Sequence, residues 1–568
     1  MKYILSYANP HHQSRYIGIE FVIENNNVGN LLVQLPSWRP GRYELGNFAK
    51  NIQRLEVLDS KGNPLKFQKI KKDLWEIKTD GAAEIHINYN YYAAELNAGS
   101  TWLSEEQLYV NPVNCLLFVP ARINEECIVE LRIPEDYLFA SSLISPSLRG
   151  GQGVCQFRAK DFHELADSPF IASNSLQHHS FICENTTINL WFQGLAHKPD
   201  WSRLENDFFK FIKEQYLVFG SFPFSEYHFL IHLTPHQSYH GVEHQQSTVI
   251  TLGPAHSVFE GDLYNELLGV SSHEIFHAWN IKKIRPIEMF PYDYTKENYS
   301  RLGFVCEGIT TYYGDLMLFR AGVFSEEKYF IEFNKQLQKH FDNFGRWNMS
   351  VADSSFDTWL DGYSAGVPNR KTSIYTEGCL LAFMTDVLIR KHTNNKKSLD
   401  DVMRALYNDF GQKERGYSEK DYQTIVETVA GISFQEFFND YVYGTKSYEP
   451  ILTECLEYLH WEIKKVPSPK YNEAYLGFKV SEEHNKIVVK SIYPNSAADK
   501  AGLKINDEIV AVNGTKINTE LHQWCNYASK DNPKRVEFAV VSAGKLKSIV
   551  IEIRDEIYYQ NYFVVKKN

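Results

Sequence analysis

The segment 272–280, Ser-His-Glu-Ile-Phe-His-Ala-Trp-Asn, constrains the fold of this chain more than any other stretch. On an α-helix, residues four positions apart leave the same face, so His273 and His277 would present their imidazoles side by side. Two neutral imidazoles about 6 Å apart are able to bind one zinc ion. Glu274, beside the first of them, would then act on a water bound by that zinc. Apolar residues at three- and four-residue spacings through this region predict a mostly buried helix.

The alternative is a buried helix whose histidines only satisfy hydrogen bonds. In a chain of 568 residues with 20 histidines, this five-residue pattern is expected by chance roughly 0.04 times. The pattern therefore favours a metal site and leaves the simpler interpretation open.

A catalytic zinc site normally has a third protein ligand and one open position. The residues after His277 are Ala-Trp-Asn-Ile, which lack the Gly and His of the metzincin continuation. Glu307 is an acid within an otherwise apolar helix predicted for residues 301–322, and a bound metal would explain the burial of its carboxylate. The alternative ligands belong to a polar connection where a surface role is the simpler interpretation: Glu288, Asp293 and Glu297.

Composition limits the class of protein. A length of 568 residues predicts two to four domains, and 43% hydrophobic with 23% charged residues is typical of globular proteins. The net charge of −11 argues against nucleic-acid binding. Eight scattered cysteines without a C-x-x-C pair argue against zinc-ribbon and thioredoxin-like sites. We see no signal peptide and no membrane-spanning stretch, so we expect a cytoplasmic protein without a membrane span.

Three regions follow one another along the chain. Residues 1–175 contain short alternating strand segments and predict a β-sandwich or open barrel, with the aromatic turn 38–43 as a structural corner. Residues 176–454 are mainly helical, with strands predicted at 188–192 and 227–233. Residues 455–568 return to strand patterns. The predicted fold class is therefore multidomain α+β.

Several motifs together resemble one known family, the glycyl aminopeptidases, which are PDZ-containing gluzincin zinc metallopeptidases related to aminopeptidase N. The motifs are 273–280 running into Lys-Lys-Ile-Arg-Pro at 282–286, Pro-Tyr-Asp-Tyr at 291–294, Glu-Gly-Ile-Thr-Thr-Tyr-Tyr at 307–313, the 38–41 turn and the C-terminal module. The resemblance covers essentially the whole chain. It implies an N-terminal β-sandwich-like domain (1–175), a thermolysin-like catalytic domain (176–454) and a PDZ-like domain (455–568). It also implies one zinc ion per chain, bound by His273, His277 and Glu307, with Glu274 as the base.

Residues 374–378, Ile-Tyr-Thr-Glu-Gly, resemble the Tyr-x-Lys-Gly segment of gluzincin aminopeptidases. The resemblance implies that the phenol of Tyr375 donates a hydrogen bond to the oxyanion formed during peptide hydrolysis. Glu377 stands where the family has lysine. The alternative for Tyr375 is an aromatic residue of the core.

Residues 240–244, His-Gly-Val-Glu-His, resemble the Gly-Ala-Met-Glu-Asn segment of aminopeptidase N, and only the glutamate matches in position. The resemblance implies a substrate-binding segment formed by Gly241, Val242 and Glu243. The carboxylate of Glu243 would pair with the free α-amine of a peptide, which would make the enzyme an aminopeptidase. The alternative is an ordinary loop carboxylate.

The run Leu476-Gly477-Phe478 resembles the carboxylate-binding loop of PDZ domains. Backbone N–H groups of such a loop capture a peptide C-terminus, and the adjoining strand pairs with the peptide. The alternative is a module with a purely structural role.

The leading hypothesis is a zinc aminopeptidase that removes N-terminal residues from peptides by glutamate-assisted attack of a zinc-bound water. The resemblance implies small residues, Gly or Ala, at that terminus. One alternative is a PDZ-bearing peptide-binding scaffold with weak or no catalysis, which metal analysis would reveal. The other alternative is a zinc endopeptidase, which would cleave N-acetylated peptides.

Overall fold

A computed structural model of the chain describes residues 1–7, 14–26, 28–143, 153–364, 366–531 and 534–567. The chain forms two compact units. Unit 1 comprises Met1–Tyr329, Val351–Gly366 and Ser373–Tyr443, and unit 2 comprises Phe330–Ser350, Val367–Thr372 and Gly444–Asn568. Along the sequence, a strand-rich region comes first, a mainly helical region follows, and a second strand-rich region comes last. This order confirms the α+β class. The domain boundaries at residues 175 and 454 stay predictions.

The N-terminal part of unit 1 contains three β-sheets. The six-stranded sheet has the order β12-β10-β1-β2-β7-β4, with β1 Lys2–Tyr7, β2 Tyr16–Ile23, β4 Ile52–Asp59, β7 Ile85–Tyr92, β10 Cys127–Arg132 and β12 Val154–Ala159. The four-stranded sheet, β11-β13-β9-β8, has β8 Trp102–Leu103, β9 Gln107–Val110, β11 Leu138–Ser141 and β13 Phe170–Ser173. The three-stranded sheet, β3-β6-β5, has β3 Asn30–Gln34, β5 Phe67–Lys71 and β6 Leu74–Lys78. Alternate residues of β7, from Ile85 to Tyr91, are buried because one face of the sheet covers the core.

A five-stranded sheet supports the middle region. Its order is β14-β15-β16-β18-β17, with β14 Gln177–Cys183, β15 Thr186–Gln193, β16 Glu226–Leu233, β17 Ser238–Glu243 and β18 Ser247–Gly253. The strands predicted at 188–192 and 227–233 fall within β15 and β16. Strand β17 lies at the edge of the sheet, antiparallel to β18, so residues 240–243 are part of an edge strand.

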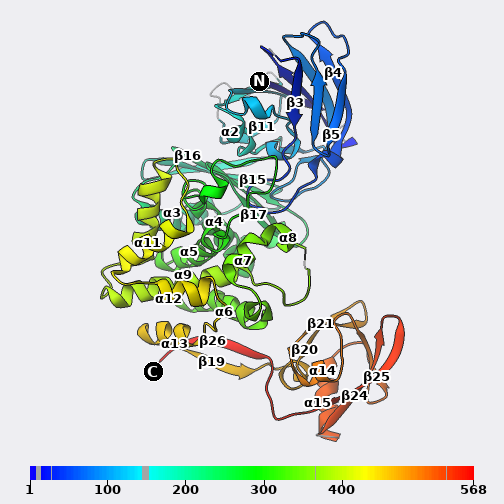
Figure 1. The fold of residues 1–568 in the computed structure, drawn as a ribbon, viewed down its shortest axis with the longest axis vertical. Helices are drawn as coiled ribbons and strands as arrows, with labels where there is room; N and C mark the ends of the chain where they lie inside the picture. Colours follow the sequence, from blue (N-terminus) through cyan, green and yellow to red (C-terminus); the bar gives the residue numbers. More distant parts are fainter. Residues whose placement is uncertain (8–13, 27, 144–152, 365, 532–533, 568) are drawn as a thin grey trace. The chain divides into compact units, whose positions relative to one another are not determined.

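The helices that carry the predicted site residues lie together in the green part of unit 1 (Figure 1). They are α4 Gly261–Phe276, the π-helical turn η7 Phe304–Ile309, α5 Thr310–Arg320 and α9 Ile374–His392. The single helix predicted for 301–322 is thus a π-turn followed by an α-helix. Gly308 and Gly378 let η7 and α9 approach closely, because a Cβ built at Gly308 would lie 2.3 Å from Gly378 Cα. The π-turn, a feature frequent at functional sites, contains Glu307.

Unit 1 contains further helical segments. They are α1 Pro112–Cys115, α2 Phe162–Ala166, α3 Trp201–Phe219, α7 Val351–Phe356, α8 Thr358–Asp361, α10 Leu399–Leu406, α11 Glu419–Ala430, α12 Gln435–Phe437 and the π-turns η9 Tyr407–Gly411 and η10 Phe438–Val442. Helix α6, Glu326–Asp342, begins in unit 1 and ends in unit 2.

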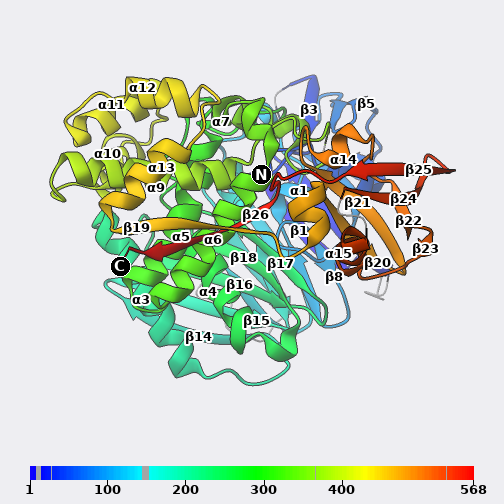
Figure 2. The ribbon, with the colours of Figure 1, turned by 90° about the horizontal axis from the view of Figure 1, so that it is seen from below.

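Unit 2 contains the C-terminal β module. Its main sheet has the order β20-β21-β22-β24-β25, with β20 Phe478–Glu483, β21 Lys486–Ile492, β22 Glu508–Val512, β24 Arg535–Ser542 and β25 Lys545–Glu552, and β23 Thr515–Lys516 pairs with β22. Strand β19 Trp461–Pro467 pairs with β26 Gln560–Lys566 (Figure 2). The helical segments are α13 Glu449–Tyr458, η11 Asn472–Leu476, α14 Ala497–Lys500 and α15 Leu521–Asp531.

Two further features concern the cysteines and the helices. All eight cysteines are buried and free. Within the part of the chain that the structure describes, no helix combines the length and the apolar character needed to cross a membrane.

Candidate active site

The two histidines of the opening motif meet at the end of α4. His273 lies in the last turn of the helix, and His277 follows directly as its C-cap. Their Nε2 atoms are 3.0 Å apart. His277 Nδ1 is 2.7 Å from the Asn280 carbonyl oxygen, which makes Nδ1 the protonated nitrogen and leaves the Nε2 lone pair for a metal. The predicted shared face of the two imidazoles is therefore present.

Glu307 lies opposite the two imidazoles. Its side chain is 3% exposed, and its Oε2 atom is 3.4 Å from His277 Nε2 and 4.0 Å from His273 Nε2. The other carboxylate oxygen accepts a hydrogen bond of 3.0 Å from the Tyr43 hydroxyl. Asn280 donates to the Val305 carbonyl (3.0 Å) and so ties the segment after α4 to the π-turn. The π-turn and the end of α4 thus hold all three predicted ligands against one another.

This donor set fits a zinc ion. One ligand atom from each of the residues His273, His277 and Glu307 lies within 4.8 Å of the other two. Burial would lower the pKa of His277, but the carboxylates around it, Glu307 first, raise that pKa to about 9. A divalent cation would neutralise this concentration of buried negative charge, and two imidazoles with one carboxylate is a common catalytic zinc set.

A second group of three residues meets the same distance criterion: Glu243, Glu274 and His277. It shares His277 with the first group and places two further carboxylates beside the metal position. The alternative ligands Glu288, Asp293 and Glu297 do not belong to either group among the described residues. Glu288 accepts a hydrogen bond from Ser300 (3.2 Å), and Asp293 accepts one from the Thr295 hydroxyl (2.7 Å).

Glu274 is buried, at 6% exposure, and its position depends on a glycine. A Cβ at Gly241 of β17 would lie 2.1 Å from Glu274 Oε1. No described residue makes a hydrogen bond to Glu274 Oε2. Burial raises the pKa of Glu274 to about 8, with the negative charges of Glu243 and Glu307 adding to the effect and His277 opposing it. A carboxylate in such surroundings is suited to accept and return a proton near neutral pH.

Glu243 ends β17 and is 4% exposed. Burial would raise the pKa of Glu243, but the positive charge of Lys282 leads the effects that hold it below its ordinary value. Lys282 Nζ is 3.9 Å from Glu243 Oε1 and 2.9 Å from Asp167 Oδ1. Asp167 also lies 3.1 Å from His244 Nδ1. This buried network keeps Glu243 charged beside His277.

The other two residues of the predicted substrate-binding segment have different surroundings. Gly241 carries the close contact to Glu274 just described. The side chain of Val242 packs in an apolar cluster with Val249 and Leu230, so only its backbone is available to a substrate.

Tyr375 lies in the first turn of α9 and is half-buried. Burial raises the pKa of Tyr375 well above its ordinary value, and the nearby Glu307 carboxylate adds to this, so the phenol keeps its proton. It shares a hydrogen bond with the Tyr363 hydroxyl, which in turn accepts from the Tyr43 backbone N–H (3.3 Å).

The turn at 38–43 takes part in the site, which the sequence interpretation as a structural corner did not include. Besides the bond from Tyr43 to Glu307, a Cβ at Gly41 would lie 2.4 Å from Glu243 Oε2. The corner role is also present, since Trp38 is fully buried and its indole N–H donates to the Asp293 carbonyl (2.8 Å). Tyr363, Asp167 and Lys282 were missed as well. Of these three residues, only Lys282 belongs to a motif that the sequence analysis had singled out, the segment 282–286.

The C-terminal loop 476–478 has little free hydrogen-bonding capacity at its centre. Gly477 has a positive φ of 83°, and its N–H is bonded to the Asn472 carbonyl as the cap of η11. The side chains of Leu476 and Phe478 are fully buried in the core of the module.

Three family descriptions match the chain. Residues 2–174 match the Peptidase M61 N-terminal domain, residues 266–381 match M61 glycyl aminopeptidase, and residues 488–542 match the PDZ domain. These matches confirm the resemblance drawn from the motifs and identify the C-terminal module as a PDZ domain. A search of curated proteins found no match.

Two solved structures are similar to this chain, one of them over its full length. An aminopeptidase N family protein from Idiomarina loihiensis is 25% identical, with a TM-score of 0.90 and coverage of 100% of this chain and 98% of that one. An M1 zinc metallopeptidase from Deinococcus radiodurans is 12% identical, with a TM-score of 0.49 and coverage of 79% and 94%, a likeness too distant to support any argument. Two family descriptions that cover the N-terminal sheets and the three proposed zinc ligands, and a full-length structural likeness, show that the chain is a metallopeptidase and belongs to the M61 glycyl aminopeptidase family.

Proposed function

We propose that this zinc aminopeptidase removes single, small residues from the N-terminus of peptides. The observation that carries the proposal is the position of Glu243. Its carboxylate belongs to the same cluster, within 4.8 Å, as Glu274 and His277. When the α-ammonium of a peptide pairs with Glu243, there is therefore room for one residue between that amine and the peptide bond cleaved with the help of Glu274. An endopeptidase would need space for several residues there.

Each residue of the site has a separate role in the proposed reaction. Glu243, kept charged by Lys282, binds the α-ammonium of the substrate. Glu274 takes a proton from the attacking water and returns it to the leaving amine. Tyr375, which keeps its phenolic proton, donates a hydrogen bond to the developing oxyanion. His273, His277 and Glu307 would hold the zinc ion, and Tyr43 orients Glu307.

The zinc ion, when bound, supplies a Lewis acid that polarises the peptide carbonyl and acidifies water. The protein's part is to hold the ligands in one geometry before the substrate arrives. The bond from His277 Nδ1 to Asn280 and the bond from Tyr43 to Glu307 serve this purpose.

The preference for Gly and Ala rests on the family, and the turn at 38–43 supports it. The backbone of Gly41 lies against Glu243 Oε2, so the N-terminal domain covers the carboxylate that would bind the amine. A cover at this point restricts the space beside the terminal amine.

Hydrolysis of Gly- and Ala-anilides, with N-acetylated peptides in parallel, tests the proposal. We expect anilide hydrolysis that a chelator abolishes, that Zn²⁺ restores and that Glu274→Gln removes. Full activity of Glu274→Gln, or cleavage of N-acetylated peptides at a similar rate, would contradict it. Glu266→Gln, an exposed change in the same helix, is the matched control.

Peptide binding by the PDZ domain is a second candidate function. It is favoured by β20, which pairs with β21 only and so forms an edge of the sheet within the described residues. The use of the Gly477 N–H inside the protein argues for strand pairing over capture of a terminal carboxylate. Binding of an unstructured peptide to the whole chain, measured with its free and amidated C-terminus, distinguishes the two modes.

A further inference from the structure

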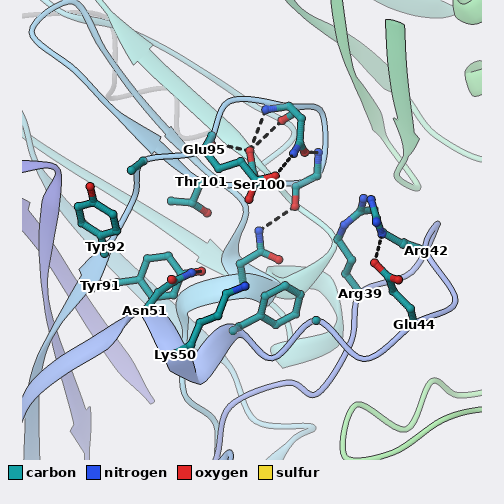
Figure 3. A pocket seen from close by; sticks show the side chains of 16 residues that line it. Arg39, Arg42, Glu44, Lys50, Asn51, Tyr91, Tyr92, Glu95, Ser100 and Thr101 are labelled. Carbon is teal, nitrogen blue, oxygen red and sulfur yellow. Dashed lines mark hydrogen bonds and ion pairs between the residues drawn. The ribbon is translucent and has the colours of Figure 1, made fainter. Parts of the chain in front are cut away.

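A pocket of about 420 Å³ lies in the N-terminal domain and has no part in the chemistry described above. Its lining is mostly polar: Arg39 and Arg42 lie on one side, with Lys50, Asn51 and Tyr91 opposite them (Figure 3). Ser100 and Thr101 lie beside Glu95 and complete the wall between these two sides. A volume of this size is enough for a small organic ligand.

The guanidinium of Arg39 is buried without a counter-ion in contact. The residue is 5% exposed, and the hydrogen bond of its side chain is to the Pro40 carbonyl, at 3.3 Å. Within the described parts of the chain, no carboxylate lies within 4.0 Å of it. An arginine offers five N–H donors, and a buried charge without a partner is costly, so a residue in this state favours an external anion. Burial lowers the pKa of Arg39, in agreement with its desolvated position.

The acidic residues of the pocket are already engaged. Glu44 forms an ion pair with the neighbouring Arg42, and Glu95 accepts a hydrogen bond of 2.6 Å from Asn97. Neither neutralises Arg39. Their charges also disfavour a phosphate dianion, whereas a single carboxylate matches the two parallel N–H groups of one guanidinium.

The Arg39 guanidinium is held in place by a glycine. A Cβ at Gly99 would lie 2.1 Å from Arg39 Cζ, so the guanidinium lies directly on the backbone of the 97–100 loop. The amide of Asn114 fixes this loop by donating to the Gly99 carbonyl (2.8 Å). The cation is therefore positioned before any ligand enters.

The pocket adjoins the active site through the turn at 38–43. Arg39 is two residues from Gly41, whose backbone lies against Glu243. The charges of Tyr363 and Glu243 act against the lowering of the Arg39 pKa by burial. Two kinds of carboxylate are able to pair with Arg39: one carried by the terminal residue of a substrate, and one of a free organic acid.

We propose that this pocket is a carboxylate-binding subsite anchored by Arg39. Its ligand is either the side chain of an acidic residue at the N-terminus of a substrate or a free dicarboxylate. The first source rests on the proposed aminopeptidase function and adds acidic residues to the small ones that the enzyme removes. The second source is independent of that function.

Calorimetric titration of the zinc-loaded protein with glutarate tests the free ligand. We expect saturable binding, weakened about tenfold or more by Arg39→Gln because one bidentate contact is lost. Gly99→Ala should weaken it similarly while keeping the charge, since the new methyl group displaces the guanidinium. Arg158→Gln, an exposed and ion-paired arginine of the same domain, is the matched control and should bind normally. Thermal melts identify any variant that fails to fold.

Hydrolysis of Asp-, Glu- and Ala-anilides tests the substrate-borne carboxylate. We expect Arg39→Gln to lower kcat/KM for the acidic substrates relative to Ala-anilide by about tenfold or more. Glutarate binding without this selective loss assigns the pocket to a free acid, and the selective loss without glutarate binding assigns it to the substrate. If wild-type protein shows neither, or if Arg39→Gln changes neither, the proposal is wrong. Hydrolysis of Ala-anilide reports separately on the proposed function.

Discussion

Replacing Gly241 by alanine should disable the enzyme without unfolding it. The added Cβ would lie 2.1 Å from Glu274 Oε1, 2.7 Å from its Cδ and 2.9 Å from its Cγ. Restoring an ordinary contact of 3.4 Å requires the carboxylate oxygen to move by about 1.3 Å. A displacement of roughly 1 Å in a reacting group costs on the order of 100-fold in rate. We therefore expect kcat for Ala-anilide to fall about 100-fold.

The same change should leave metal and substrate binding almost unaltered. The three atoms nearest to the new methyl group all belong to Glu274 and none to a proposed zinc ligand, so the zinc content should stay at one ion per chain. KM should change little, because Glu243 and the cover over it are kept. Anilide hydrolysis assays measure kcat and KM, metal analysis measures the zinc content, and thermal melts measure the stability, all on the same preparation.

Gly269→Ala is the matched control, in the same helix as Glu274. The atom closest to its new Cβ would be Asp315 Oδ1, at 4.0 Å, so the site is open. Removing a helix-interior glycine should raise stability by roughly 0.5–1 kcal/mol and leave kcat unchanged. A Gly241→Ala enzyme with wild-type kcat, or one that has lost its zinc, would refute the argument that this glycine sets the position of Glu274.

Three further changes probe other parts of the site. Tyr43→Phe removes the hydrogen bond to Glu307 and should weaken zinc binding about 10- to 100-fold in a chelator competition, and an unchanged affinity would show that Glu307 needs no such support. Tyr375→Phe should lower kcat about 100- to 1,000-fold with little change in KM, whereas an effect confined to KM would assign Tyr375 to binding. Asp167→Asn leaves Lys282 buried without its closest partner and should cost about 3–5 kcal/mol in urea unfolding at pH 7. The charge of Lys282 is among the effects that hold the pKa of Asp167 below its ordinary value in spite of burial. This stabilisation is therefore complete above pH 5 and is lost as the pH falls through the folded pKa. The difference in free energy of unfolding between wild type and Asp167→Asn should therefore become smaller only at acid pH. A difference that became larger at acid pH would contradict this reasoning.

Much of the metal centre could be predicted from the sequence because its geometry is local. Helical spacing alone places His273 and His277 on one face, and the cost of burying an unpaired acid singles out Glu307. The π-turn that carries Glu307 had no such signal. It depends on the contact between Gly308 and Gly378, which lie 70 positions apart in the chain.

The parts that escaped prediction depend on contacts between distant segments. Tyr43 and Glu307 are 264 positions apart, and Asp167 and Lys282 are 115 positions apart. No periodicity or spacing links such residues. The turn at 38–43 was correctly interpreted as a corner from its Trp and Pro, but its contacts with two active-site carboxylates follow only from the folded structure.

The hydrogen bond from Tyr43 to Glu307 makes the N-terminal domain a part of the proposed metal centre. A shortened chain that begins after residue 175 would retain all three proposed zinc ligands, Glu274 and Tyr375. It would lack the donor to Glu307 and the backbone that covers Glu243. The peptidase region is thus not an interchangeable module: grafting it onto another β domain would transfer the ligands and leave behind the groups that orient them.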